Sequence, residues 1–232
     1  LYLIILGLVF IFLTSSNIKI KFNFIVRMPH FKFPCHYVHW GQVKDHENIK
    51  SKLLPIINSL ISENKYTNPF KACSMKTNIS KMTDFIDNET KDKIVSENLT
   101  KMISETNCFP EKNPTDTFIT EYWFNVYEKG DFQEMHNHNT VPKVIDGKRC
   151  DDIFSVIYIL HEEEPTPVLF RVDNIELPFY PMKHIIDFET SRVDEIKEGT
   201  ILIFSSHLNH TVFPVKQSGR TTIAFNVSCT FE

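Results

Sequence analysis

The chain has 232 residues, which suits one domain or one domain with a modest N-terminal extension. Its formal net charge is −4 with both signs interspersed, which argues against a basic face for nucleic acid. The 5 cysteines are scattered and include no C-x-x-C pair. Free thiols in a reducing compartment such as the cytoplasm are therefore expected, rather than a disulfide framework.

Residues 1–27 are predicted to lie outside the functional domain. Residues 1–12 are almost wholly apolar, but a run of about a dozen residues is short for a membrane span and closer to the apolar part of a signal peptide. The alternative is a membrane anchor over residues 1–13. Contact with a membrane is expected only in that case.

Residues 28–115 are predicted to form a helical support region. A short strand is expected over His36–Trp40. Apolar residues then recur with helical spacing over Lys44–Asn64 and again over Lys91–Thr106. Pro55 should kink the first helix or mark a late start. We expect both helices to pack on one face of the β-structure that follows.

Residues 116–232 are predicted to form a β-rich core. The expected strands are Phe118–Tyr127, Phe154–Leu160, Pro167–Val172, Ile185–Phe188, Thr200–Ser205, Thr211–Val215 and Thr221–Phe231. Short strands separated by Gly and Pro at this spacing favour a sandwich or jelly roll. The H-E-E-E run that begins at His161 is predicted to be a solvated turn. The fold class is therefore mainly β with flanking helices.

Three histidines in the β-rich part could bind one metal ion. His136 and His138 are two residues apart, so in an extended strand they point to the same face. His210 follows a separate apolar strand much later in the chain. Three ligands on one side of a metal, with open positions opposite, are typical of non-haem Fe(II) oxygenases. Three neutral imidazoles are equally the ligand set of a zinc enzyme.

Arg220 and Thr222 begin the last predicted strand and share a face by the same periodicity. A guanidinium offers a planar fork that matches a carboxylate, so the pair suits the far end of a dicarboxylate. The alternative for Arg220 is a surface charge after a Ser-Gly turn.

Four segments, taken together in order and spacing, resemble the 2-oxoglutarate/Fe(II)-dependent dioxygenase superfamily, in particular its 2OG-Fe(II) oxygenase group of bacteria and phages. They are W-F-N…G-D-F-Q…H-N-H (Trp123–His138), S-V-I-Y-I-L (Ser155–Leu160), E-G-T-I-L-I-F-S-S…N-H-T-V-x-P (Glu198–Pro214) and G-R-T-T-I-A-F-N (Gly219–Asn226). The resemblance implies a double-stranded β-helix, a jelly roll of the cupin-like kind. It also implies Fe(II), 2-oxoglutarate as cosubstrate, and consumption of O2 to hydroxylate a C–H bond, with release of succinate and CO2.

Carried over by position, the resemblance makes His136 the first metal ligand and His210 the last. It assigns the distal carboxylate of the cosubstrate to Arg220 and Thr222. Two further positions match side chains that often contact the cosubstrate in the family: Asn125 and Tyr158.

One position departs from the pattern of the superfamily. His138 stands where an Asp or Glu is usual, so an all-imidazole site is expected, more positive by one unit of charge. Should His138 not be a ligand, the nearest carboxylates that could replace it are Asp131, Asp151 and Asp152.

The resemblance implies an enzyme that acts on a peptide side chain or a small molecule. A second hypothesis is a cupin-like barrel with other metal-dependent chemistry, which has no need of a carboxylate clamp at Arg220. A third is a non-catalytic jelly-roll binding module, which would leave the three histidines unexplained.

Overall fold

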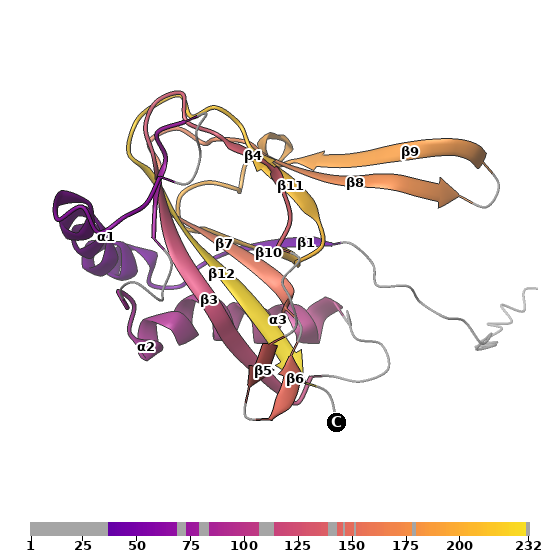
Figure 1. Ribbon diagram of the computed structural model, residues 1–232, viewed down its shortest axis with the longest axis horizontal. Coiled ribbons are helices and arrows are strands. Elements are labelled where there is room, and N and C mark those ends of the chain that lie inside the picture. Colours follow the sequence, from indigo (N-terminus) through magenta and orange to yellow (C-terminus); the bar gives the residue numbers. More distant parts are fainter. Residues whose placement is uncertain are drawn as a thin grey trace, which may run out of the picture. The chain divides into compact units, whose positions relative to one another are not determined.

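The computed structural model describes residues 37–68, 73–78, 84–106, 114–138, 143–145, 147–150, 152–177 and 180–230 (Figure 1). These residues belong to one unit, Cys35–Glu232. The N-terminal extension expected at residues 1–27 lies outside them. Among the described helices, none is long and apolar enough to cross a membrane.

Two antiparallel sheets make up the β-structure. The larger has 6 strands in the order β1-β10-β7-β12-β3-β2, and the smaller has 4 in the order β4-β11-β8-β9. A separate hairpin pairs β5 with β6. The bounds are β1 Val38–Gln42, β2 Lys76–Thr77, β3 Asp116–Tyr127, β4 Gln133–His136, β5 Lys143–Ile145, β6 Lys148–Cys150, β7 Asp152–His161, β8 Val168–Leu177, β9 Tyr180–Glu189, β10 Thr200–Ser205, β11 Asn209–Val212 and β12 Arg220–Thr230. The chain crosses between the two sheets repeatedly, which confirms the predicted double-stranded β-helix.

Helices cover the outer face of the larger sheet (Figure 1). Helix α1 spans His46–Ser62 and continues through Pro55, so Pro55 does not mark a late start of the helix. The second predicted helix is a continuous series of α2 (Asn88–Lys91), a π-helical turn (Asp92–Ser96) and α3 (Glu97–Thr106). It begins earlier than expected because the Asp87 carboxylate accepts the Thr90 N–H at 3.0 Å, a side-chain N-cap.

Alternation along the strands of the larger sheet separates two sets of buried side chains. The first set packs against the helices and forms a core with Leu53 and Ile57 of α1. On β3, β7 and β12 its members are Tyr122, Phe124, Val126, Phe154, Val156, Tyr158, Leu160, Ile223, Phe225, Val227 and Cys229. Residues between them face the smaller sheet, because successive side chains of a strand point to opposite faces. The interior between the sheets therefore belongs to the second set.

Several strands were not expected or have other bounds than expected. The support region contributes β1, which pairs with β10, and β2, which pairs with β3, so it adds strands to the larger sheet as well as helices. Strand β4 was not predicted, because its sequence Q-E-M-H is short and polar. Strand β11 begins at Asn209 rather than after His210. These pairings are long-range and leave little local pattern.

Candidate metal centre and carboxylate pocket

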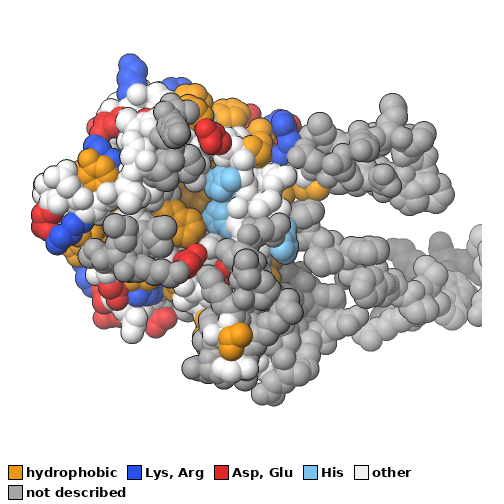
Figure 2. Space-filling view, in the orientation of Figure 1, with side chains coloured by type: hydrophobic (Ala, Val, Ile, Leu, Met, Phe, Trp, Pro, Cys, Tyr) orange, Lys and Arg blue, Asp and Glu red, His pale blue; other side chains and the backbone are white. Residues whose placement is uncertain are grey.

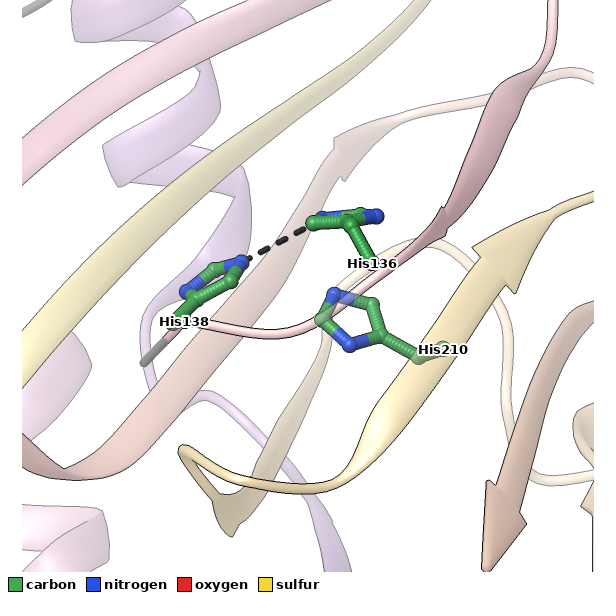
Figure 3. Close-up of side chains that lie close together, drawn as sticks. All are labelled: His136, His138 and His210. Carbon is green, nitrogen blue, oxygen red and sulfur yellow. Dashed lines mark hydrogen bonds between the residues drawn. The ribbon is translucent and has the colours of Figure 1, made fainter. Parts of the chain in front are cut away.

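His136 and His210 lie opposite each other on neighbouring strands. His136 ends β4, and His210 is its direct partner on β11. His138 follows two residues after His136, and its backbone N–H donates to the Ser206 carbonyl at 2.9 Å. The ring centroids of His136 and His210 are 4.1 Å apart, and those of His138 and His210 are 5.0 Å apart. Three rings from two strands and the loop after β4 therefore converge on one point (Figure 3).

Hydrogen bonds to backbone carbonyls orient two of these rings. The Nδ1 of His136 lies 2.7 Å from the Glu134 carbonyl oxygen, and the Nδ1 of His210 lies 3.1 Å from the Leu208 carbonyl oxygen. A carbonyl oxygen only accepts, so in both rings Nδ1 carries the proton. The Nε2 atoms are then left with free lone pairs, as a metal ligand requires.

The third ring is oriented by an amide. The Nδ1 of His138 lies 2.8 Å from Oδ1 of Asn226, whose own Nδ2 faces the Glu121 carboxylate at 3.4 Å. This leaves the Nε2 of His138 directed at the Nε2 of His136, 3.3 Å away (Figure 3). Two lone pairs at that distance repel unless a cation or a proton lies near both.

Burial favours the neutral form of all three imidazoles. Burial lowers the pKa of His136. Burial and the neighbouring His136 lower the pKa of His138 to about 4. Burial, with His136 and His138 close by, lowers the pKa of His210 well below its ordinary value. The ligand atoms of the three lie within 4.8 Å of one another, and this donor set fits a divalent metal ion.

No carboxylate joins this group among the residues that the structure describes. Asp131 accepts hydrogen bonds from Ser74 and from the Glu128 N–H, and Asp151 is outside the described residues. Asp152 accepts from the Thr120 and Ser228 hydroxyls at 2.7 Å each. The two described alternatives to His138 are thus engaged elsewhere.

A pocket between the two sheets joins the histidines to Arg220. Its walls are Trp123, Asn125, Tyr127, Gln133, His136, His138, Ile157, Val168, His210, Val212, Arg220, Thr222 and Ala224. Histidine and hydrophobic side chains reach the surface together near the centre of one face (Figure 2). The free space between the walls is about 10 Å³, roughly the room that one water molecule needs. A larger ligand therefore requires the lining side chains to shift.

The guanidinium of Arg220 is buried with unused hydrogen-bond donors. Its Nε donates to Oε2 of Glu162 at 3.0 Å, and both side chains are 2% exposed. It lies over the ring of Tyr127, 5.3 Å from the centroid. Its terminal atoms Nη1 and Nη2 have no hydrogen-bond partner among the described residues. A buried donor without a partner is costly, so this end of the pocket fits an anionic group that accepts from both nitrogens.

Thr222 and Asn125 line the pocket with Arg220, as expected of side chains facing the interior. Tyr158 does not line it. Tyr158 points to the helix side of β7, and its hydroxyl lies 2.6 Å from Nδ1 of His46 on α1. The cause is the two-residue period of the strand, which turns Ile157 into the pocket and Tyr158 away from it. The prediction that Tyr158 contacts the cosubstrate is therefore corrected: its side chain lies on the opposite face of β7 from the pocket.

Two residues that contact Arg220 were missing from the sequence-based expectations. Tyr127 lies two residues after Asn125 on β3, so the strand period could have indicated it; burial raises its pKa to about 12. Glu162 belongs to the run beginning at His161 that was expected to be solvated, yet it is buried. The charge run carried no sign of that burial, because its buried partner Arg220 lies far along the chain.

An ion cluster supports the turn that carries Glu162. The Glu198 carboxylate accepts the Glu162 N–H at 2.9 Å and contacts Lys50 Nζ at 2.5 Å and His161 Nδ1 at 2.7 Å. Burial raises the pKa of Glu198, but the hydrogen bonds from Lys50, the Glu162 N–H, His161 and His46 outweigh it and hold the pKa at about 2. The ionised carboxylate is thus stabilised by folding.

We expect this cluster to lose its stabilising effect in acid. The folded pKa of Glu198, about 2, lies below its ordinary value of 4.5, so the contribution is complete above pH 4.5 and disappears as the pH falls toward 2. Its size is on the order of 2 kcal/mol after allowance for partial exposure. Urea unfolding of wild type and Glu198→Gln at a series of pH values tests this. The difference in unfolding free energy should shrink over that window; a constant difference would contradict the assignment.

Comparison with known proteins gives the fold. No protein-family model matches the chain, and no curated protein sequence matches it. Among solved structures, the non-heme alpha ketoglutarate dependent carbocyclase SnoK from nogalamycin biosynthesis superposes with a TM-score of 0.54 at 8% identity, covering 83% of this chain and 79% of that one. AviO1 from Streptomyces viridochromogenes Tue57 gives 0.52 at 13% identity, covering 85% and 91%. A Pseudomonas putida prolyl-4-hydroxylase gives 0.48 at 14% identity, covering 85% and 94%. The likeness to SnoK and AviO1 shows a shared double-stranded β-helix.

Proposed function

We propose that this chain is a 2-oxoglutarate- and Fe(II)-dependent oxygenase that hydroxylates a C–H bond of a peptide side chain or small molecule. One observation carries the proposal. One pocket is lined by three convergent imidazoles and by a buried guanidinium whose Nη1 and Nη2 have no hydrogen-bond partner among the described residues. A metal-binding group with a separate carboxylate-binding group matches the two ends of 2-oxoglutarate.

Each group of residues has a distinct part in this proposal. His136, His138 and His210 hold the iron, and their depressed pKa values keep protons from competing for the ligand atoms at neutral pH. Arg220 and Thr222 bind the distal carboxylate. When bound, iron and 2-oxoglutarate supply the oxidising chemistry, while the protein supplies position and a dry site.

The pocket walls favour this division of labour. Ile157, Val168 and Ala224 contribute apolar surface to the pocket that the histidines and Arg220 also line. Low polarity there strengthens the attraction between the guanidinium and an incoming carboxylate. Because the free space is now about 10 Å³, binding must move side chains, a common event at binding sites whose backbone stays fixed.

The unused donors of Arg220 favour this function over the second hypothesis. A cupin-like barrel with other metal chemistry accounts for the three imidazoles, which also suit zinc. It gives no reason to bury a guanidinium whose Nη1 and Nη2 have no partner in the part of the chain that the structure describes. A non-catalytic binding module would leave the histidines and Arg220 both unexplained.

Anaerobic spectroscopy tests the proposal directly. Protein loaded with Fe(II) should develop a weak visible charge-transfer band when 2-oxoglutarate is added, because the cosubstrate chelates the iron. In air, the same sample should release succinate slowly without added substrate. A chain that holds iron but shows neither the band nor succinate would contradict the proposed function.

Replacement of Tyr158 by phenylalanine tests the corrected placement of that residue. The Tyr158 hydroxyl contacts His46 rather than the pocket. Affinity for 2-oxoglutarate should therefore stay unchanged, while the free energy of unfolding falls by about 1 kcal/mol from the lost hydrogen bond. Titration of the charge-transfer band and urea unfolding measure the two quantities. A clear loss of affinity in Tyr158→Phe would return Tyr158 to the cosubstrate site.

A further inference from the structure

Glu162 lies behind Arg220, outside the pocket itself. Its Oε2 accepts from Arg220 Nε at 3.0 Å, and it is absent from the residues that line the pocket. Both side chains of this pair are 2% exposed. Glu162 therefore acts on a ligand only through the guanidinium that it holds.

Holding one nitrogen of a guanidinium fixes the direction of the others. The group is planar, with five N–H bonds in a rigid fork. Nε is engaged by Glu162, and Cζ lies over the ring of Tyr127, 5.3 Å from its centroid. The direction of Nη1 and Nη2, which have no hydrogen-bond partner among the described residues, is therefore set. A ligand carboxylate then meets a fork that is already ordered, which removes part of the entropic cost of binding.

Glu162 is itself held in place from two sides. Its Oε2 accepts the Thr166 N–H at 3.3 Å, and its own N–H donates to Glu198 at 2.9 Å. Glu198 is tied to helix α1 through Lys50 Nζ at 2.5 Å. The guanidinium is thus connected through fixed polar contacts to the helical layer outside the larger sheet.

We propose that Glu162 is a positioning residue for the carboxylate end of the pocket: it aims Arg220 so that the pocket prefers a dicarboxylate over a 2-oxo acid without the second carboxylate. The inference rests on the proposed function and deepens it. The geometry of the Glu162 carboxylate, rather than its charge alone, sets the preference.

Two keto acids and three variants separate geometry from charge. The probes are 2-oxoglutarate and 2-oxopentanoate, in which a methyl group replaces the distal carboxylate. Their affinities for the anaerobic Fe(II) protein are measured by calorimetry. Glu162→Asp keeps the charge but withdraws the carboxylate by about 1.5 Å, one C–C bond. Glu162→Gln keeps an oxygen in place without the charge. The control Glu164→Asp makes the same change two residues along, where the carboxylate pairs with Lys216 at the surface.

The preference for 2-oxoglutarate is the quantity to compare. Wild type should prefer it by more than about 100-fold, since two charge-assisted hydrogen bonds depend on the second carboxylate. Glu162→Asp should reduce the preference by about 10-fold or more through weaker 2-oxoglutarate binding, with 2-oxopentanoate unaffected. Glu162→Gln and Glu164→Asp should stay within about threefold of wild type.

The outcomes separate this inference from the proposed function. A wild type that binds the two acids equally would contradict the proposed function. A folded Glu162→Asp that keeps the wild-type preference, or a Glu162→Gln that loses it, would overturn the positioning role alone.

An NMR measurement on the wild type covers the case in which Glu162→Asp fails to fold. The Arg220 Nε–H resonance, assigned by its absence in Arg220→Lys, should exchange slowly with solvent before any 2-oxoglutarate is added. The Nη resonances should sharpen only after addition. Rapid exchange of the Nε–H in the unliganded protein would show that Glu162 does not hold the guanidinium, and would overturn the inference.

Discussion

Replacing Arg220 by alanine is expected to abolish binding of 2-oxoglutarate. The guanidinium is the only charged side chain among the pocket walls that the structure describes. Each hydrogen bond to a charged group contributes about 1.5–3 kcal/mol, and every 1.4 kcal/mol is about tenfold in affinity. Two such bonds from Nη1 and Nη2 therefore predict a loss of more than about 100-fold. Anaerobic titration of the charge-transfer band measures it.

The same substitution should also destabilise the fold. It leaves the carboxylate of Glu162 buried without its partner, and breaking a buried pair in this way costs about 3–5 kcal/mol. The double variant Arg220→Met with Glu162→Met removes both charges and should recover most of that stability without recovering binding. Arg192→Met is a matched control, because Arg192 is 61% exposed and pairs with Asp187 outside the pocket. Wild-type affinity in a folded Arg220→Ala would contradict the carboxylate site.

Replacing His138 by alanine is expected to remove bound iron. His138 supplies one of three convergent imidazoles and has no described carboxylate to replace it. Loss of an outer partner of a metal ligand typically costs about 10–100-fold in metal affinity, and loss of the ligand itself should cost more than that. Iron content after desalting, with competition against a chelator, measures the change. Unchanged occupancy in His138→Ala would remove His138 from the ligand set.

Two companion variants distinguish a ligand from a neighbour. Asn226→Ala removes the amide that orients the His138 ring at 2.8 Å and should cost about 10–100-fold in iron affinity. His161→Ala is the control: this histidine contacts Glu198 away from the metal centre, so iron affinity should not change. Equal losses in Asn226→Ala and His161→Ala would indicate a general effect on folding rather than ligation.

Local periodicity grouped residues that the structure brings together in one pocket. Alternation along β12 places Arg220 and Thr222 on one face. The two-residue spacing of His136 and His138 also grouped these residues correctly, although β4 ends at His136 and His138 lies in the loop that follows. Helical spacing likewise located α1 closely, at His46–Ser62, because burial of one helix face imposes a regular apolar pattern. The resemblance of ordered motifs then pointed to the double-stranded β-helix that the structure contains.

Only the tertiary structure decided which face of each strand meets which layer. Periodicity groups Tyr158 with Val156 but does not say that this face packs on α1 while Ile157 faces the pocket. Strand β4 forms by pairing with β11, far along the chain. Its short polar sequence contains no local pattern that predicts this pairing.

Glu162 shows most clearly what could not be predicted from the sequence. In sequence it is one acid in a charged run, expected in solvent; in the fold it is a buried partner of Arg220. A charge can be buried only where an opposite charge and hydrogen bonds compensate for lost hydration. That compensation comes from a residue 58 positions away, so the amino-acid pattern determined the chemistry available to this protein, and long-range packing determined where it is used.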